Sequence, residues 1–88
     1  MAKQKVIKFY ATWCGPCKIY GKTFDRVKEE LAEGNEYVEV DVDKDTTGLA
    51  AEYKVQSIPQ TTIIREDGSV DTKEGRLNDA ELKAFILN

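Results

Sequence analysis

The sequence contains no histidine. This absence removes the side chain that most often serves as general base, metal ligand or pH switch near neutral pH. The 88 residues also include no apolar run long enough to cross a bilayer, and the N-terminus lacks the apolar core of a signal peptide. These absences predict a cytoplasmic protein with no membrane partner.

Charge of one sign is not in excess either. A net charge of −3 gives no electrostatic case for binding nucleic acid or an anionic membrane. A hydrophobic fraction of 41% and a charged fraction of 33% are typical of a compact soluble domain and argue against disorder. We therefore expect one domain over residues 1–88, with a single core, acting as a monomer.

Cysteine is scarce, with only Cys14 and Cys17. A disulfide between them would close too small a loop to restrict the unfolded chain much, so a reactive Cys-x-x-Cys pair is favoured over a structural cross-link. Two unreactive thiols or half of a zinc site are the alternatives, but two ligands cannot fill a tetrahedral zinc site. We expect no metal and no bound cofactor, the Cys14–Cys17 pair being a redox-active disulfide.

The segments around the pair predict a strand followed by a helix. Residues 6–10 form an apolar run interrupted only by Lys8, which is typical of a central strand covered on both faces. A helix should begin near Cys14 or Gly15, since Pro16 suits a first helical turn, and should end at Gly34-Asn35. Its buried stripe, at spacings of three and four residues, would be Cys17, Tyr20, Phe24, Val27 and Leu31.

This helical phase makes the two cysteines unequal. Cys17 falls on the buried stripe, whereas Cys14 lies at the helix start, where N–H groups point outward and the dipole is positive. Such a position can lower a cysteine pKa from about 8.5 to roughly 7 or below. Because only a thiolate attacks sulfur, we predict that Cys14 is an exposed nucleophile and that Cys17 is a buried partner that resolves the mixed disulfide.

The middle of the chain predicts a second strand and a short helix. Residues 37–43 alternate strictly and place Val38, Val40 and Val42 on one face. Asp45 or Thr46 could cap a short helix that turns Leu49, Ala50 and Tyr53 inward. Residues 55–59 then form a loop.

The C-terminal part predicts a hairpin and a last helix. Asp67-Gly68 favours a tight turn between strands at 61–64 and 70–74, and Gly75 ends the second of these. Asn78 with Glu81 forms a capping-box start for a helix that buries Leu82, Phe85 and Ile86. The predicted order is βαβαββα.

The string Trp13-Cys14-Gly15-Pro16-Cys17-Lys18, with Ile58-Pro59 before a later strand, resembles the thioredoxin family. Gly68 and Gly75 also stand where that family has glycines. The resemblance covers essentially the whole chain. It implies the α/β thioredoxin fold, a four-stranded mixed sheet flanked by helices. It also implies a protein-disulfide reductase recharged by a flavin-dependent, NADPH-linked thioredoxin reductase.

Three features depart from full-length thioredoxins. The extra N-terminal strand and helix are lacking, which leaves the shorter core shared with glutaredoxins. Gln60 after Pro59 looks like the Pro-Gln of glutaredoxins. Lys8 occupies the position of the family's buried aspartate.

Lys8 should be buried between Val6 and Tyr10, where an unpaired ammonium is costly. Glu39 aligns with a lysine of many thioredoxins. Our hypothesis is therefore an exchanged pair, Lys8 with Glu39, either of which could accept or relay the Cys17 proton. The alternative is that Lys8 extends to solvent and has no role.

The resemblance assigns further residues to the site. Gly15-Pro16 accompanies reducing members, Trp13 would cover the sulfurs, and Lys18 would keep the local field positive. A packed aromatic and a solvated lysine are the alternatives. Pro59 is expected to be cis and to face the cysteines, rather than trans at a strand start. The backbone of Ile58 would then pair with an extended substrate segment. The candidate substrate-binding residues are Trp13, Ile58, Pro59, Gln60 and Gly75.

Two other functions remain open. Gln60 and the short fold favour a glutathione-dependent glutaredoxin, whereas Gly15-Pro16 and the lack of an evident basic pocket argue against it, with Lys18 and Arg76 as candidate cations. A non-catalytic thioredoxin-like subunit of another enzyme is the second alternative. An iron–sulfur scaffold is disfavoured by Pro16 and by the second cysteine.

Overall fold

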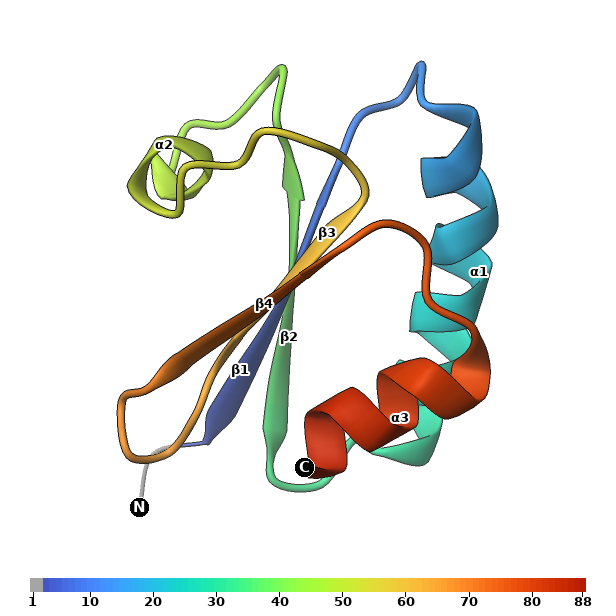
Figure 1. Ribbon diagram of the computed structural model, residues 1–88, viewed down its shortest axis with the longest axis vertical. Coiled ribbons are helices and arrows are strands. Elements are labelled where there is room, and N and C mark those ends of the chain that lie inside the picture. The colour runs from blue at the N-terminus through green and yellow to red at the C-terminus, as the bar shows by residue number, and fades with distance from the viewer. Residues whose placement is uncertain (1–2) are drawn as a thin grey trace.

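The computed structural model describes residues 3–88, which form a four-stranded mixed sheet with helices on both faces (Figure 1). The elements are β1 (Gln4–Tyr10), α1 (Gly15–Glu30), β2 (Asn35–Asp41), α2 (Leu49–Glu52), β3 (Gln60–Ile64), β4 (Val70–Glu74) and α3 (Asp79–Leu87). The strand order is β2-β1-β3-β4, with β1 and β2 parallel and the other pairs antiparallel. The predicted order βαβαββα is confirmed.

The central strand β1 separates two apolar cores. Figure 1 shows α1 and α3 on one side of the sheet and α2 on the other. Val6 packs with Tyr20, Phe24 and further residues of α1 and α3, whereas Ile7 and Phe9 pack toward α2. Successive side chains of a strand point to opposite faces, so the near-continuous apolar run of β1 serves both cores.

Several predicted boundaries are wrong by one to a few residues; the second strand, for example, ends at Asp41 and not at residue 43. α1 ends at Glu30, with Leu31 as its C-cap, instead of reaching Gly34-Asn35. Gly34, with φ +79°, instead turns the chain directly into β2, which starts at Asn35 because that residue pairs with Gln4. The cap of α2 is Gly48, not Asp45 or Thr46. The Asp45 carboxylate still contributes, since it accepts the N–H of Ala50 at 2.9 Å.

The predicted hairpin and capping box are present. β3 and β4 pair antiparallel, and Asn78 and Glu81 each accept the other's backbone N–H, at 2.8 and 3.0 Å. The helix that follows buries Leu82, Phe85 and Ile86. Local sequence therefore specified this half of the chain well.

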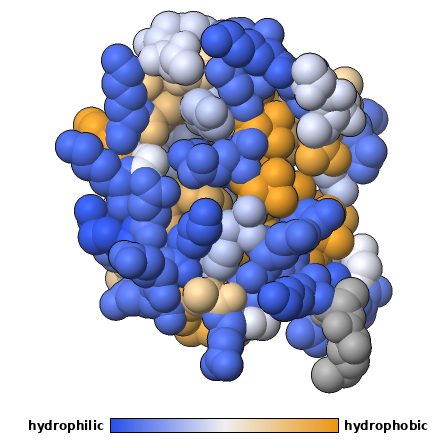
Figure 2. Space-filling model, turned by 180° about the vertical axis from the view of Figure 1, so that it is seen from behind, coloured by the Kyte–Doolittle hydropathy of each residue, from blue (hydrophilic) through white to orange (hydrophobic). Residues whose placement is uncertain are grey.

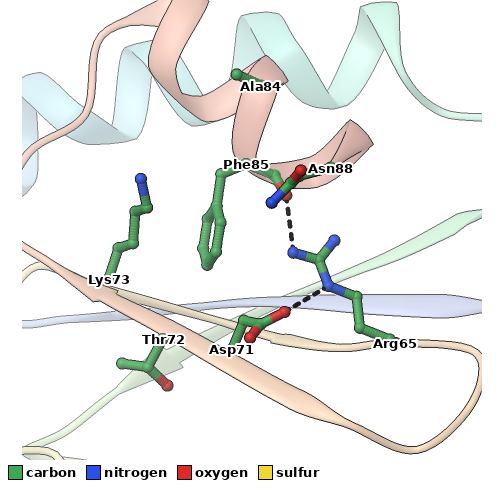
Figure 3. Close-up of a pocket in the computed structure, with 7 residues that line it drawn as sticks. All are labelled: Arg65, Asp71, Thr72, Lys73, Ala84, Phe85 and Asn88. Carbon is green, nitrogen blue, oxygen red and sulfur yellow. Dashed lines mark hydrogen bonds and ion pairs between the residues drawn. The ribbon is translucent and has the colours of Figure 1, made fainter.

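Arg65 ties the end of α3 to the sheet. Its guanidinium donates to the carbonyls of Phe85 and Ile86 at 2.9 and 3.0 Å, and to the Asp71 carboxylate at 2.9 Å. Figure 3 shows Arg65, Asp71 and Phe85 around a hollow of about 400 Å³ between β4 and α3. None of the predicted site residues lines this hollow, so we assign Arg65 to structure rather than to chemistry.

Within residues 3–88 no helix combines the length and the apolar character that crossing a bilayer requires.

Candidate active site

The two cysteines lie at the junction of β1 and α1 and form a disulfide, with their Cα atoms 5.2 Å apart. Cys14 is the N-cap of α1, Gly15 is the first helical residue, and Pro16 stands in the first turn. The Cys17 N–H donates to the Cys14 sulfur at 3.2 Å. No acidic side chain occupies the first turn, so nothing there opposes negative charge on Cys14.

The predicted exposure of Cys14 is wrong for this disulfide state. Cys14 is 6% exposed and Cys17 is 3% exposed. Both cysteines form a buried cluster with Ala11, called the cysteine cluster below. Tyr10, Val42 and Ile58 pack against it. Helical phase correctly buried Cys17, but it could not foresee that loops distant in sequence also cover Cys14.

Trp13 is the most exposed large apolar residue beside the disulfide, at 70%. Its indole Nε1 donates to the Asp43 carboxylate at 2.6 Å. Trp13 lines a hollow of about 390 Å³ together with residues of α2 and of the segments before and after it: Val42, Ala50, Ala51, Val55, Gln56, Ser57 and Ile58. Trp13 therefore flanks the site instead of packing in the cysteine cluster. Sequence reasoning missed Asp43, which carries no local signal.

The face of the molecule opposite to that seen in Figure 1 also exposes apolar surface. Figure 2 shows orange atoms among blue ones toward the side of the molecule where α2 lies. This is the side to which Trp13 and Ile58 contribute the apolar hollow described above.

The Ile58–Pro59 bond is cis, as expected. Pro59 is buried, and its carbonyl accepts the N–H of Gly75 at 2.8 Å. Gly75 has φ +89°, a conformation that favours glycine. Ile58 packs against the cysteine cluster, and its own N–H and C=O have no hydrogen-bond partner among residues 3–88. Loop 55–59 and the end of β4 thus meet beside the disulfide.

Gln60 does not belong to the exposed surface. It is 2% exposed, pairs with Phe9 of β1 and donates to the Thr62 hydroxyl at 3.3 Å. Because Gln60 aligns with Phe9, its side chain lies on the α2 face of the sheet and not toward α1. The prediction that Gln60 lines the substrate surface opposite the cysteines is corrected here.

Lys8 is buried and paired, as the exchanged-pair hypothesis expects. It is 6% exposed, and its Nζ lies 3.1 Å from the Glu39 carboxylate, which remains partly exposed. The ammonium also lies 4.8 Å from the centre of the Tyr10 ring and 5.2 Å from that of Phe24. These contacts offset the cost of burying the charge and exclude the alternative in which Lys8 extends to solvent.

A second hollow, of about 330 Å³, opens between α1 and the end of β1. Its lining residues are Lys8, Tyr10, Ala11, Thr12, Cys17, Lys18 and Gly21. Lys18, which lines this hollow, is exposed. Arg76 after Gly75 is exposed as well, but it does not line the hollow. Deeper in the core, the Tyr20 hydroxyl bonds that of Thr61, and burial raises the pKa of Tyr20 to about 12. Tyr20 is thus a neutral structural group at ordinary pH.

No group of three or more His, Cys, Asp or Glu side chains within residues 3–88 is arranged to hold a metal ion. The chemistry available to the described site is that of the dithiol and its disulfide.

Comparison with known proteins gives consistent results. The thioredoxin family model matches residues 1–88. Thioredoxin of Mycoplasmoides gallisepticum is 40% identical over 96% of this chain and 82% of its own length. A thioredoxin-like protein of Synechocystis is 32% identical over 91% of this chain and 75% of its own.

Two solved structures extend this result. Chloroplastic thioredoxin z has a TM-score of 0.84 at 29% identity, covering 96% of this chain and 75% of its own. Fasciola hepatica thioredoxin has a TM-score of 0.84 at 30% identity, covering 97% of this chain and 79% of its own.

Proposed function

Because this chain belongs to the thioredoxin family and is a dithiol thiol–disulfide oxidoreductase, we propose a division of roles between its two sulfurs. Cys14 is the attacking thiolate and Cys17 the resolving thiol. The observation that carries this assignment is the Cys14 sulfur at the N-terminus of α1, accepting the Cys17 N–H at 3.2 Å. An N–H donor and the positive end of a helix dipole both favour a thiolate over a thiol.

The reaction balances in two exchange steps. The Cys14 thiolate attacks one sulfur of a substrate disulfide, a mixed disulfide forms, and the first substrate thiolate leaves. The Cys17 thiol then loses its proton and attacks the Cys14 sulfur. The second substrate thiolate leaves as the Cys14–Cys17 disulfide closes, so two electrons pass to the substrate.

We assign substrate binding to the surface formed by Trp13, the Ile58-Pro59 segment and Gly75. Three observations support this. The indole of Trp13 is exposed, the backbone N–H and C=O of Ile58 have no hydrogen-bond partner among residues 3–88, and the Gly75 N–H donates to the Pro59 carbonyl. An extended segment flanking the substrate cysteine could pair with the Ile58 backbone, strand to strand. Gly15 and Pro16 would shape the turn that holds the two sulfurs, and Lys18 would add positive charge at its edge.

We assign Lys8 and Glu39 a supporting electrostatic role behind Cys17. The Lys8 ammonium favours a thiolate nearby, and the partly exposed Glu39 carboxylate can exchange protons with water. Their 3.1 Å ion pair supports this role, because it fixes the ammonium at a buried position on the α1 side of β1.

For recharging, we propose an NADPH-linked thioredoxin reductase in the cytoplasm. Gly15-Pro16 between the cysteines supports a reductant of this kind. Glutathione is the alternative electron source, for which the exposed cations Lys18 and Arg76 are the candidate contacts. A non-catalytic binding role is separated from both by a variant that lacks both cysteines, since binding would survive and reductase activity would not.

The test of the division of roles uses single-cysteine variants. Cys17→Ser should accumulate a stable mixed disulfide through Cys14 with a protein disulfide substrate, because nothing resolves it. Cys14→Ser should form far less, since the remaining Cys17 thiol lacks the position of Cys14 at the N-terminus of the helix. Non-reducing electrophoresis with mass spectrometry would detect the adducts. Equal trapping by both variants, or preferential trapping by Cys14→Ser, would contradict the assignment.

A further inference from the structure

The sheet has two open edges within the described chain. The strand order β2-β1-β3-β4 leaves one side of β2 and one side of β4 without a neighbouring strand among residues 3–88. An open edge presents unpaired N–H and C=O groups and can accept a further strand. The charges along each edge decide whether that strand can come from a second copy of the same chain.

Alternate residues of β4 have their backbone groups on its open side. The Arg65 N–H donates to the Ser69 carbonyl at 2.8 Å, and the Gly75 N–H donates to the Pro59 carbonyl at 2.8 Å. Hydrogen-bonded residues alternate along an antiparallel pair, so Asp71 and Lys73 are also bonded to β3. The residues whose N–H and C=O point away from β3 are therefore Val70, Thr72 and Glu74.

The edge of β2 would repel a second copy of β2. This strand carries the acidic residues Glu36, Glu39 and Asp41 and has no basic residue. Two copies paired side by side would bring these carboxylates together, and like charges on neighbouring strands are destabilising. The β2 edge is thus protected against self-association.

The edge of β4 is complementary to itself, because an acidic and a basic residue flank its central Thr72. When two copies pair antiparallel with Thr72 opposite Thr72, each Asp71 lies opposite the partner's Lys73. Val70 then pairs with Glu74, so every outward N–H and C=O of β4 finds a partner. Opposite charges and paired threonines are both favourable cross-strand neighbours.

The α3 side of β4 has room for the partner's charged side chains. The hollow of about 400 Å³ between β4 and α3 is lined by both Asp71 and Lys73. Figure 3 shows the Lys73 side chain directed toward α3, while Thr72 points the other way. Lys73 has no ion-pair partner in the described part of the chain. Asp71 bonds Arg65 through one carboxylate oxygen, which leaves the other oxygen for the partner's Lys73.

We propose that β4 is a self-association edge, through which two copies of this chain form a dimer with one continuous sheet. The pairing is two-fold symmetric about Thr72, so it uses both β4 edges and closes. A strand of five residues makes a small interface, and we expect a dissociation constant of about 0.1 mM.

This dimer differs from the monomer expected from the sequence, and it does not depend on the proposed roles of the cysteines. The C-terminal end of β4 lies beside the active site, since Gly75 bonds Pro59. Antiparallel pairing therefore places the two active sites at opposite ends of the joined strands. Both sites stay open in the dimer.

Two measurements on the oxidised protein test the proposal. Sedimentation equilibrium up to a concentration of about 1 mM should show a reversible monomer–dimer equilibrium. Amide hydrogen exchange followed by NMR locates the interface. The amides of Val70, Thr72 and Glu74 should exchange more slowly as the concentration rises, whereas those of β2 should not change.

Two variants of the edge separate strand pairing from general charge effects. Thr72→Pro removes an outward N–H without breaking a bond to β3, a substitution that edge strands tolerate. Lys73→Glu places carboxylates opposite each other. Each variant should weaken association about tenfold or more. Lys22→Glu is the matched control, because this exposed residue of α1 gives the same change in net charge. It should leave the dissociation constant within about twofold.

A charge exchange provides a positive test. Asp71→Lys and Lys73→Glu should each associate poorly alone, but an equimolar mixture should associate more tightly than either, since each lysine on one edge then faces a carboxylate on the other. The inference is overturned if association is absent up to about 1 mM. Slowed amide exchange confined to another surface, undiminished association of Thr72→Pro, or equal weakening by Lys73→Glu and Lys22→Glu would overturn it as well.

Discussion

A single buried cation distinguishes the interior of this site. Lys8 Nζ is held by the Glu39 carboxylate at 3.1 Å and lies near the rings of Tyr10 and Phe24. Since the carboxylate is partly exposed while the ammonium is buried, the two partners have unequal desolvation costs. Removing Lys8 should therefore not lower the free energy of unfolding, whereas removing the charge of Glu39 should lower it.

For Lys8→Met we expect a free energy of unfolding equal to or greater than that of the unaltered protein, because an apolar chain replaces a buried charge. Glu39→Gln should lose about 1–2 kcal/mol, because it leaves Lys8 without its counter-charge. Urea denaturation of the oxidised proteins measures both. Lys8→Met should also slow the Cys17 step. The proposed electrostatic role of Lys8 and Glu39 is wrong if Lys8→Met reduces substrate as fast as the unaltered protein and Glu39→Gln unfolds at the same urea concentration.

At the scale of elements, the C-terminal helix depends on a long-range anchor as well as on its local cap. The Asn78–Glu81 capping box fixes the start of α3, whereas Arg65 donates to the carbonyls of Phe85 and Ile86 at its end. Figure 3 shows Arg65 beside Phe85. The last carbonyls of a helix have no partner within the helix, so a charged donor from the sheet stabilises both elements.

Arg65→Met should lower the free energy of unfolding by about 2–3 kcal/mol, because several charge-assisted hydrogen bonds are lost at a largely buried position. Arg26→Met is the control, since it breaks the more exposed pair with Asp79 and should shift the transition little. Chemical denaturation followed by circular dichroism provides the comparison. A larger loss for Arg26→Met than for Arg65→Met would show that the anchor is not where α3 gains its stability.

At the scale of the molecule, the sheet topology assembles the site. The C-terminal ends of β1 and β4 and the N-terminal end of β3 lie at the same end of the sheet, because β3 is antiparallel to both of its neighbours. This end of the sheet therefore brings Cys14, Ile58 and Gly75 together although they are far apart in sequence. The redox pair at the start of α1 thus meets the loop that we assign to substrate binding.

Which electron donor reduces the Cys14–Cys17 disulfide depends on the whole surface around it, because the donor must dock there. With a protein disulfide such as insulin, we expect faster turnover with NADPH and thioredoxin reductase than with glutathione, glutathione reductase and NADPH. The Cys14–Cys17 couple should have a potential near about −270 mV, typical of a reductant, and not near about −120 mV. Faster turnover with glutathione, lost in Lys18→Ala or Arg76→Ala, would instead support the glutaredoxin alternative.

The sequence by itself determined the features that depend on neighbours in the chain. Spacing of three and four residues located the buried stripe of α1, and the Asn78–Glu81 pair located the start of α3. Asp67-Gly68 set the hairpin. These patterns are readable because helix periodicity, capping and turns act over a few residues.

The tertiary structure decided the features that depend on strand register and on packing between distant segments. Register with Phe9 buried Gln60 on the α2 face of the sheet, and Ile58 packs against the cluster that contains both cysteines. The hydrogen bond of Trp13 to Asp43, and the close approach of Gly21 to the Lys8 ammonium, join residues with no local signal between them. Such contacts are set by how the elements meet, and no local periodicity specifies them.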